Sequence, residues 1–163
     1  MSYATVSDMI LRFGETELIQ LTDPQNNAVV DVSLVDVKLA DAKAVIDGWI
    51  GSVFRLPLRG CLKPAAVPGD PATYEPPPQL VRLACDIARF YLFTEVAPEN
   101  VVYLRHKAAL AELQAIASGA AVLACPWGGS PGDLVGADAQ QGAEVFHSFS
   151  PRQITDDTTR GYA

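Results

Sequence analysis

The chain has 163 residues, of which 49% are hydrophobic, and a formal net charge of −7 with an isoelectric point near 4.7. This composition excludes a generally disordered chain and favours one globular domain with its own core. The negative charge argues against nucleic-acid binding over the whole surface, and the basic residues neither cluster nor alternate with aromatic ones.

Cysteine usage and hydropathy indicate the compartment. The three cysteines, Cys61, Cys85 and Cys125, are widely spaced and form no CxxC pair. This pattern predicts free thiols in a reducing compartment rather than a disulfide framework. No secretory signal is visible at the start, and no apolar run approaches the ~20 residues of a membrane span. We therefore expect a soluble protein that is made in a cytoplasm and has no membrane partner.

Three helical stretches are expected. The first, residues 7–21, has Ser7 as its N-cap and a break at Gly14. The second, residues 33–54, is the clearest, because its apolar residues recur at alternating steps of four and three: Val35, Leu39, Ala42, Ile46, Trp49 and Val53. The third, residues 78–117, is interrupted at Pro98. The stripe of the second stretch predicts core packing in preference to a partner-binding face.

Two long stretches lack helical patterning. Residues 55–78 hold seven of the twelve prolines, which lack the N–H that helices and sheet ladders use, so they predict an extended arm. This arm is either a tolerated surface insertion or an ordered contact arm. Residues 120–163 are rich in glycine and polar residues and predict an extended tail, in which 144–149 alternates weakly and favours one short strand.

These elements predict an all-α fold. The expected architecture is a small bundle of about four to five helices in a domain at residues 1–119, with the proline-rich arm at 55–77 and the C-terminal tail at 120–163. The candidate interface residues are apolar, aromatic or basic positions of the tail: Trp127, Val145, Phe146, Phe149, Arg152, Ile154 and Tyr162.

Few residues are candidates for chemistry. Arg82, Asp86 and Arg89 have helical spacing i, i+4 and i+7, which predicts a structural ion-pair ladder in preference to a catalytic acid of tuned pKa. His106 falls on an apolar helical stripe and is expected to be packed rather than to bind a ligand. Residues 23–27 are interpreted as a turn, because proline is stiff and asparagine tolerates a left-handed φ. A calcium loop is not expected there, since the glycine and terminal glutamate that it needs are missing. With no nucleotide-binding, zinc-protease or hydrolase motif present, we expect no catalytic, cofactor or metal site and no enzyme.

The order of motifs over residues 1–119 resembles the small head–tail connector proteins of Mu-like phages and prophages. The motifs that carry this resemblance are Tyr3-Ala4-Thr5, Asp8-Met9-Ile10, Arg12-Phe13-Gly14, the run Glu17-Leu18-Ile19-Gln20-Leu21-Thr22-Asp23, Ala40-Asp41-Ala42, Ile46-Asp47, Leu56-Pro57-Leu58, the run Val81-Arg82-Leu83-Ala84-Cys85-Asp86-Ile87-Ala88-Arg89, Ala109-Leu110, Leu113, Ile116-Ala117 and Gly119. In the tail the match is looser and rests on Phe149-Ser150 and Arg152.

The resemblance implies a structural virion protein located at the head–tail neck and assembled in the host bacterial cytoplasm. Such an adaptor forms a homo-oligomeric ring, of twelve copies, beneath the portal protein. It joins the portal to stopper, tail terminator or tail tube proteins and continues the DNA channel. DNA would pass without specific binding, since residues 1–54 carry eight acidic residues against three basic ones. The alternatives are a tail terminator or another tail-completion protein, and a small cytosolic helical enzyme or regulator.

Overall fold

The computed structural model describes residues 2–26, 28–67 and 70–136. These residues form five helices: α1 (Val6–Phe13), α2 (Glu15–Thr22), α3 (Val32–Ile50), α4 (Pro78–Leu92) and α5 (Val101–Ala117). Two strands, β1 (Cys61–Lys63) and β2 (Thr73–Glu75), complete the described part. The predicted all-α bundle is therefore confirmed, with a short sheet added to it. Within the described ranges, no helix is both long and apolar enough to cross a bilayer.

The first helical stretch breaks where the sequence predicted. Gly14 lies between α1 and α2 with a φ of 86°, a left-handed conformation that favours glycine. The predicted N-cap at Ser7 is wrong, because Thr5 caps α1 instead. The Thr5 hydroxyl accepts from the Asp8 N–H and the Asp8 carboxylate accepts from the Thr5 N–H, which forms a capping box.

The stripe of the second stretch becomes the inner face of α3. Four of its six members, Val35, Leu39, Ala42 and Ile46, are buried, and Asp31 caps the helix N-terminus. The helix ends at Ile50, four residues before the predicted end, and Trp49 is left 37% exposed. Near the N-terminus of the chain, the Tyr3 hydroxyl donates to the Asp47 carboxylate, and this hydrogen bond connects the N-terminal residues to α3.

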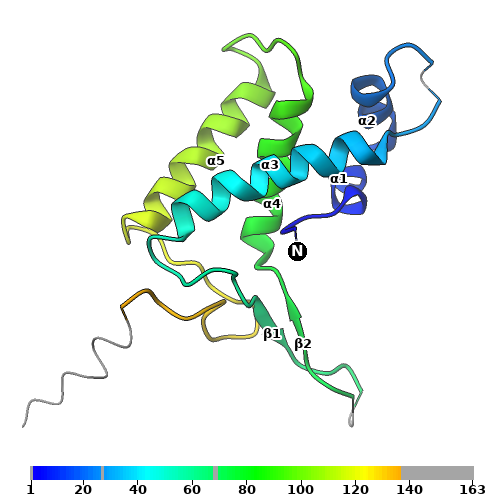
Figure 1. Ribbon diagram of the computed structural model, residues 1–163. Helices are drawn as coiled ribbons and strands as arrows, with labels where there is room; N and C mark the ends of the chain where they lie inside the picture. The colour runs from blue at the N-terminus through cyan, green and yellow to red at the C-terminus, as the bar shows by residue number, and fades with distance from the viewer. Residues whose placement is uncertain (1, 27, 68–69, 137–163) are drawn as a thin grey trace, which may run out of the picture.

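Helix α4 lies at the centre of the bundle and contacts α1, α3 and α5. In Figure 1, α3 crosses α4 and α5, while α1 and α2 pack at one end of α3. Eight of the fifteen residues of α4 are buried, including Asp86. The break between α4 and α5 is wider than the single position Pro98 and spans residues 93–100. Its last residue, Asn100, caps α5. His106 stacks on Phe90 with ring centroids 4.0 Å apart and is packed as expected.

The proline-rich arm contains the β-hairpin, which the sequence did not predict. The two strands pair antiparallel with Cys61 opposite Glu75, Leu62 opposite Tyr74 and Lys63 opposite Thr73. Neither strand contains a proline, because the arm's prolines lie before, between and after the strands. The predicted extended arm thus contains a short antiparallel ladder over these six residues. The hairpin projects away from the helices (Figure 1).

Candidate interaction surface

The hairpin carries its exposed apolar side chains on one face. Leu62 and Tyr74 lie opposite each other across the ladder and are each 49% exposed, whereas Cys61, one residue earlier, is fully buried. Alternation along the strands places Leu62 and Tyr74 on the face away from Cys61. Gly60 has a φ of 95°, and a Cβ there would lie 2.7 Å from the Glu75 carbonyl oxygen. The base of the hairpin therefore requires glycine at this position.

The segment that follows α5 packs against the root of the arm. The Gly60 N–H donates to the Pro131 carbonyl, the Arg55 N–H donates to the Asp133 carbonyl, and the Val135 N–H donates to the Val53 carbonyl, each at 2.8 Å. A Cβ on Gly132 would lie 2.9 Å from the Leu58 Cδ1 atom, so these two segments are in close contact. Residues 120–136, which the sequence analysis assigned to the tail, therefore brace the arm.

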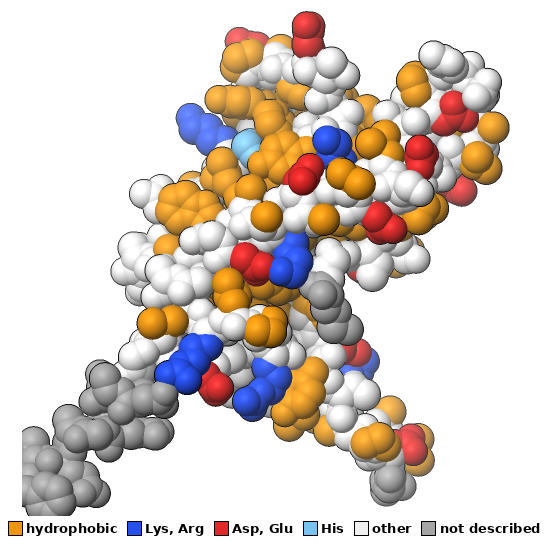
Figure 2. Space-filling model, in the orientation of Figure 1, with side chains coloured by type: hydrophobic (Ala, Val, Ile, Leu, Met, Phe, Trp, Pro, Cys, Tyr) orange, Lys and Arg blue, Asp and Glu red, His pale blue; other side chains and the backbone are white. Residues whose placement is uncertain are grey.

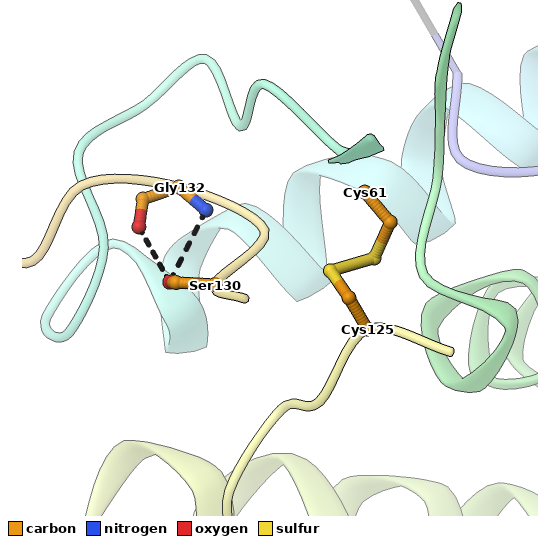
Figure 3. Close-up of a disulfide and its surroundings, with 4 residues drawn as sticks. All are labelled: Cys61, Cys125, Ser130 and Gly132. Carbon is orange, nitrogen blue, oxygen red and sulfur yellow. Dashed lines mark hydrogen bonds between the residues drawn. A yellow bond between two sulfur atoms is a disulfide. The ribbon is translucent and has the colours of Figure 1, made fainter. Parts of the chain in front are cut away.

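A disulfide joins the same two segments and overturns the expectation of three free thiols. Cys61, at the start of β1, is bonded to Cys125, which lies 64 residues later, with their Cα atoms 5.4 Å apart (Figure 3). Cys85 is a free thiol buried in α4, where burial raises its pKa to about 12. The wide spacing of the cysteines hid the pair, since it depends on the path of the chain after α5.

Trp127, the one predicted interface residue among the described residues, lies near the disulfide. Its ring is 43% exposed, and the Lys63 Nζ atom lies 5.8 Å from the ring centroid. Lys63 also pairs with Glu75 at 2.8 Å. The other predicted interface residues, which all follow residue 136, lie outside the described residues: Val145, Phe146, Phe149, Arg152, Ile154 and Tyr162.

We define the arm surface as six exposed apolar side chains of the hairpin strands and the adjoining segments: Leu56, Leu62, Tyr74, Trp127, Leu134 and Val135. Figure 2 shows hydrophobic side chains interspersed with basic ones around this part of the molecule. Exposed aromatic and apolar groups next to cationic ones are typical of protein–protein interfaces. The arm surface is therefore our candidate interaction surface.

The predicted ion-pair residues of α4 pair with residues of neighbouring helices as well as with each other. Arg82 lies 3.7 Å from the Asp86 carboxylate and also pairs with Glu112 of α5. Arg89 pairs with Glu17 of α2 instead, through its Nε atom at 2.7 Å and its Nη2 atom at 2.6 Å. These arginines therefore connect α4 to α5 and α2.

Asp86 is the one buried charged residue among the described residues, with 9% of its surface exposed. Burial raises the pKa of its carboxyl group and outweighs the lowering by Arg82, Arg105, Arg12 and Arg89. Its carboxylate is thus incompletely compensated by the surrounding guanidinium groups.

The fold and this site define a small, mostly α-helical protein with a covalently braced arm. A protein-family model described as "Bacteriophage Mu, Gp36" matches residues 3–133, and the chain belongs to this family. The protein called Gene product J of Escherichia phage Mu is 34% identical over 102 residues, which is 62% of this chain and 62% of that protein. The chain thus covers less than two thirds of this relative. The resemblance to Mu-like phage proteins is confirmed.

We predict that breaking the disulfide destabilises the arm. The double variant Cys61→Ser/Cys125→Ser should lose about 2–4 kcal/mol of unfolding free energy, because the unfolded chain is no longer cross-linked over 64 residues. Urea denaturation measures this loss, and hydrogen exchange should increase within residues 61–75 and 123–135. Reductant should reproduce the effect in the wild type and leave the double variant unchanged. An identical midpoint for the wild type with and without reductant would contradict the prediction.

We also predict that Asp86 makes stability depend on pH. Because its pKa is raised by folding, the folded protein binds the proton more tightly than the unfolded chain does. The contribution of Asp86 to the free energy of unfolding is therefore greatest at acidic pH. It is lost as the pH rises from about 4 through the pKa of Asp86 in the folded protein. Asp86→Asn should remove this loss, so the stability of the variant relative to wild type should rise between pH 4 and pH 7. Asp36→Asn, at an exposed position of α3, is the control. If the stability of Asp86→Asn relative to wild type falls over this range, the arginines lower the pKa of Asp86 more than burial raises it, and the prediction is wrong.

Proposed function

We propose that this chain is a structural virion protein that acts as a head–tail connector. In this role it forms a homo-oligomeric ring, of twelve copies, beneath the portal and joins the capsid to the tail. Stopper, tail terminator or tail tube proteins would bind its other side, and the ring would continue the DNA channel. The role requires no catalysis and places the protein in the neck of the particle.

The braced arm carries this proposal. A two-stranded hairpin is marginal in water by itself, yet this one is held by the Cys61–Cys125 disulfide and by the hydrogen bonds of residues 131–135. It keeps Leu62 and Tyr74 half-exposed and directly opposite each other, where a partner could cover both. A rigid arm with an apolar face suits contact with a neighbouring subunit, since little conformational freedom is lost on binding. Membership of a Mu phage protein family supports a role in the virion.

The charge of the protein supports passage of DNA without adhesion. The net charge is −7, and residues 1–54 contribute eight acidic and three basic residues. Like charge opposes contact with the phosphate backbone, so a channel lined by such a surface would not retain DNA.

Particles that lack this protein provide the test. Loss of a connector should give full heads without tails together with free tails of normal length, because both halves assemble but do not join. Electron microscopy of lysates from a phage with this gene deleted measures the outcome, and a plasmid copy of the gene should restore whole particles. Tails of uncontrolled length would instead identify a tail terminator and would refute the connector role.

We further propose that residues 145–154 bind the portal or a neighbouring subunit. Deletion of residues 144–163 should leave the helical circular dichroism signal intact and abolish co-purification with the portal protein. Phe146→Ser/Phe149→Ser should have the same effect, because the apolar anchors are removed. Thr158→Ala/Thr159→Ala changes polar positions of the deleted segment that lie outside residues 145–154. This control variant should still co-purify with the portal protein. Undiminished co-purification of the deletion variant would refute this assignment.

A further inference from the structure

A hollow lined mainly by arginines lies on the bundle, apart from the arm surface. It is formed by Arg12 and Phe13 of α1, Arg82 and Asp86 of α4, and Arg105 of α5, and it has a cavity volume of about 340 Å³ that is open to solvent. Three guanidinium groups from three helices thus surround one carboxylate. In a chain of net charge −7, such a local excess of positive charge requires an explanation.

The charges within the hollow are not balanced. Arg82 is paired with Asp86 and Glu112. Arg12 is near enough to the Cys85 thiol to lower its pKa, and Arg105 acts in the same way on Asp86. Neither Arg12 nor Arg105 forms an ion pair with any residue that the structure describes. Two guanidinium groups therefore converge on the hollow without a carboxylate of their own.

We propose that this hollow binds a carboxylate side chain of a partner protein, with Arg12 and Arg105 as its ligands. The planar guanidinium group presents paired N–H donors that match the two oxygens of a carboxylate. Asp86, the internal carboxylate that lines the hollow, is buried and pairs with Arg82, and it forms no ion pair with Arg12 or Arg105. Phe13 forms one wall, where its ring packs 4.5 Å from the Arg89 guanidinium carbon. The partner is therefore an acidic protein segment that extends one or two carboxylates into a confined site.

A protein carboxylate fits this hollow better than a nucleic-acid backbone. Acidic residues surround the arginines: Glu112 is paired with Arg82, Glu17 is paired with Arg89, and Asp8 is close enough to influence Cys85. A polyanion with regularly spaced phosphates would be repelled by these acidic residues even where one phosphate met the arginines. One or two carboxylates on a short segment meet fewer of these acidic residues than a chain of phosphates does, so they are repelled less.

Binding of defined probes to the wild-type protein tests this inference independently of the connector role. The main probe is a blocked, fluorescently labelled peptide with two adjacent glutamates in a glycine–serine context, and its counterpart with two glutamines is the control probe. We expect fluorescence anisotropy to detect the glutamate peptide and not the glutamine peptide. Arg12→Gln and Arg105→Gln should each weaken this binding at least tenfold, because each removes one guanidinium group. Lys107→Gln, at an exposed position of α5 outside the hollow, should leave binding unchanged.

Two results would overturn the assignment. One is equal affinity for the two peptides, or an equal loss in the Lys107→Gln variant, because either shows nonspecific attraction to positive charge. The other is tighter binding of a short DNA duplex that is lost in the same arginine variants, because this identifies a phosphate site. Neither result depends on whether rings or neck structures form, so failure here leaves the connector proposal standing. All three variants replace exposed side chains, so we expect each to remain folded. Thermal unfolding of each variant is the measurement that checks this.

Discussion

Burial of helix α4 is the constraint on which the rest of the structure depends. Its residues Leu80 and 83–88 are buried, and the helix contacts α1, α3 and α5, so the positions of those three helices are fixed relative to one another. The polar residues of α4 are carried inward with the apolar ones, which explains why Asp86 is buried and why its neighbours Arg82 and Arg89 pair with residues of other helices.

The same helix also sets the direction of the arm. Strand β2 ends at Glu75, and three consecutive prolines, of which the last begins α4, connect the two elements. Proline restricts φ at each of these positions, so the hairpin is joined to the bundle by a stiff connection.

The arm is ordered by contacts within one subunit. A hairpin of two three-residue strands buries too little surface to be stable in isolation. Residues 125–135 provide what is missing, through the disulfide to Cys61 and the hydrogen bonds to Val53, Arg55 and Gly60. The sequence predicts the arm and the segment after Gly119 as separate extensions, whereas in the structure they form one braced unit. This arrangement changes the energetics of any contact made by the arm surface. The ordering cost is met when the subunit folds, so binding does not have to supply it.

The helices were predictable from sequence and the arm was not, for physical reasons that particular residues make clear. A stripe such as Val35, Leu39, Ala42 and Ile46 repeats over several turns, so the periodic signal is strong and local. The strands are three residues long, too short for alternation to emerge, and the prolines around them obscured the proline-free core of each. The Cys61–Cys125 bond and the Arg89–Glu17 pair join residues 64 and 72 positions apart. Such contacts depend on the path of the chain through the tertiary structure and leave no local sequence pattern. The spacing of Arg82 and Asp86 did indicate their proximity, because both lie on one helix, but it said nothing of Glu112 or Arg105. For the same reason the arginine hollow has no sequence motif, since its members come from three helices.

The arm surface and the arginine hollow differ in chemistry and in the elements that form them. The first is apolar and belongs to the hairpin and its brace, and the second is cationic and belongs to α1, α4 and α5. A closed ring of identical subunits, with more than two copies, needs two different surfaces on each subunit, because each contact joins unlike patches. A subunit that also binds a portal and a tail component needs further surfaces, and these must be selective for their own partner. Apolar contact supplies affinity with little directionality, whereas a guanidinium–carboxylate pair has strict geometry and rejects a partner that lacks the charge. Two surfaces of unlike chemistry on one subunit would therefore keep two sets of partners distinct, since a segment that suits the apolar arm gains nothing from the arginine hollow.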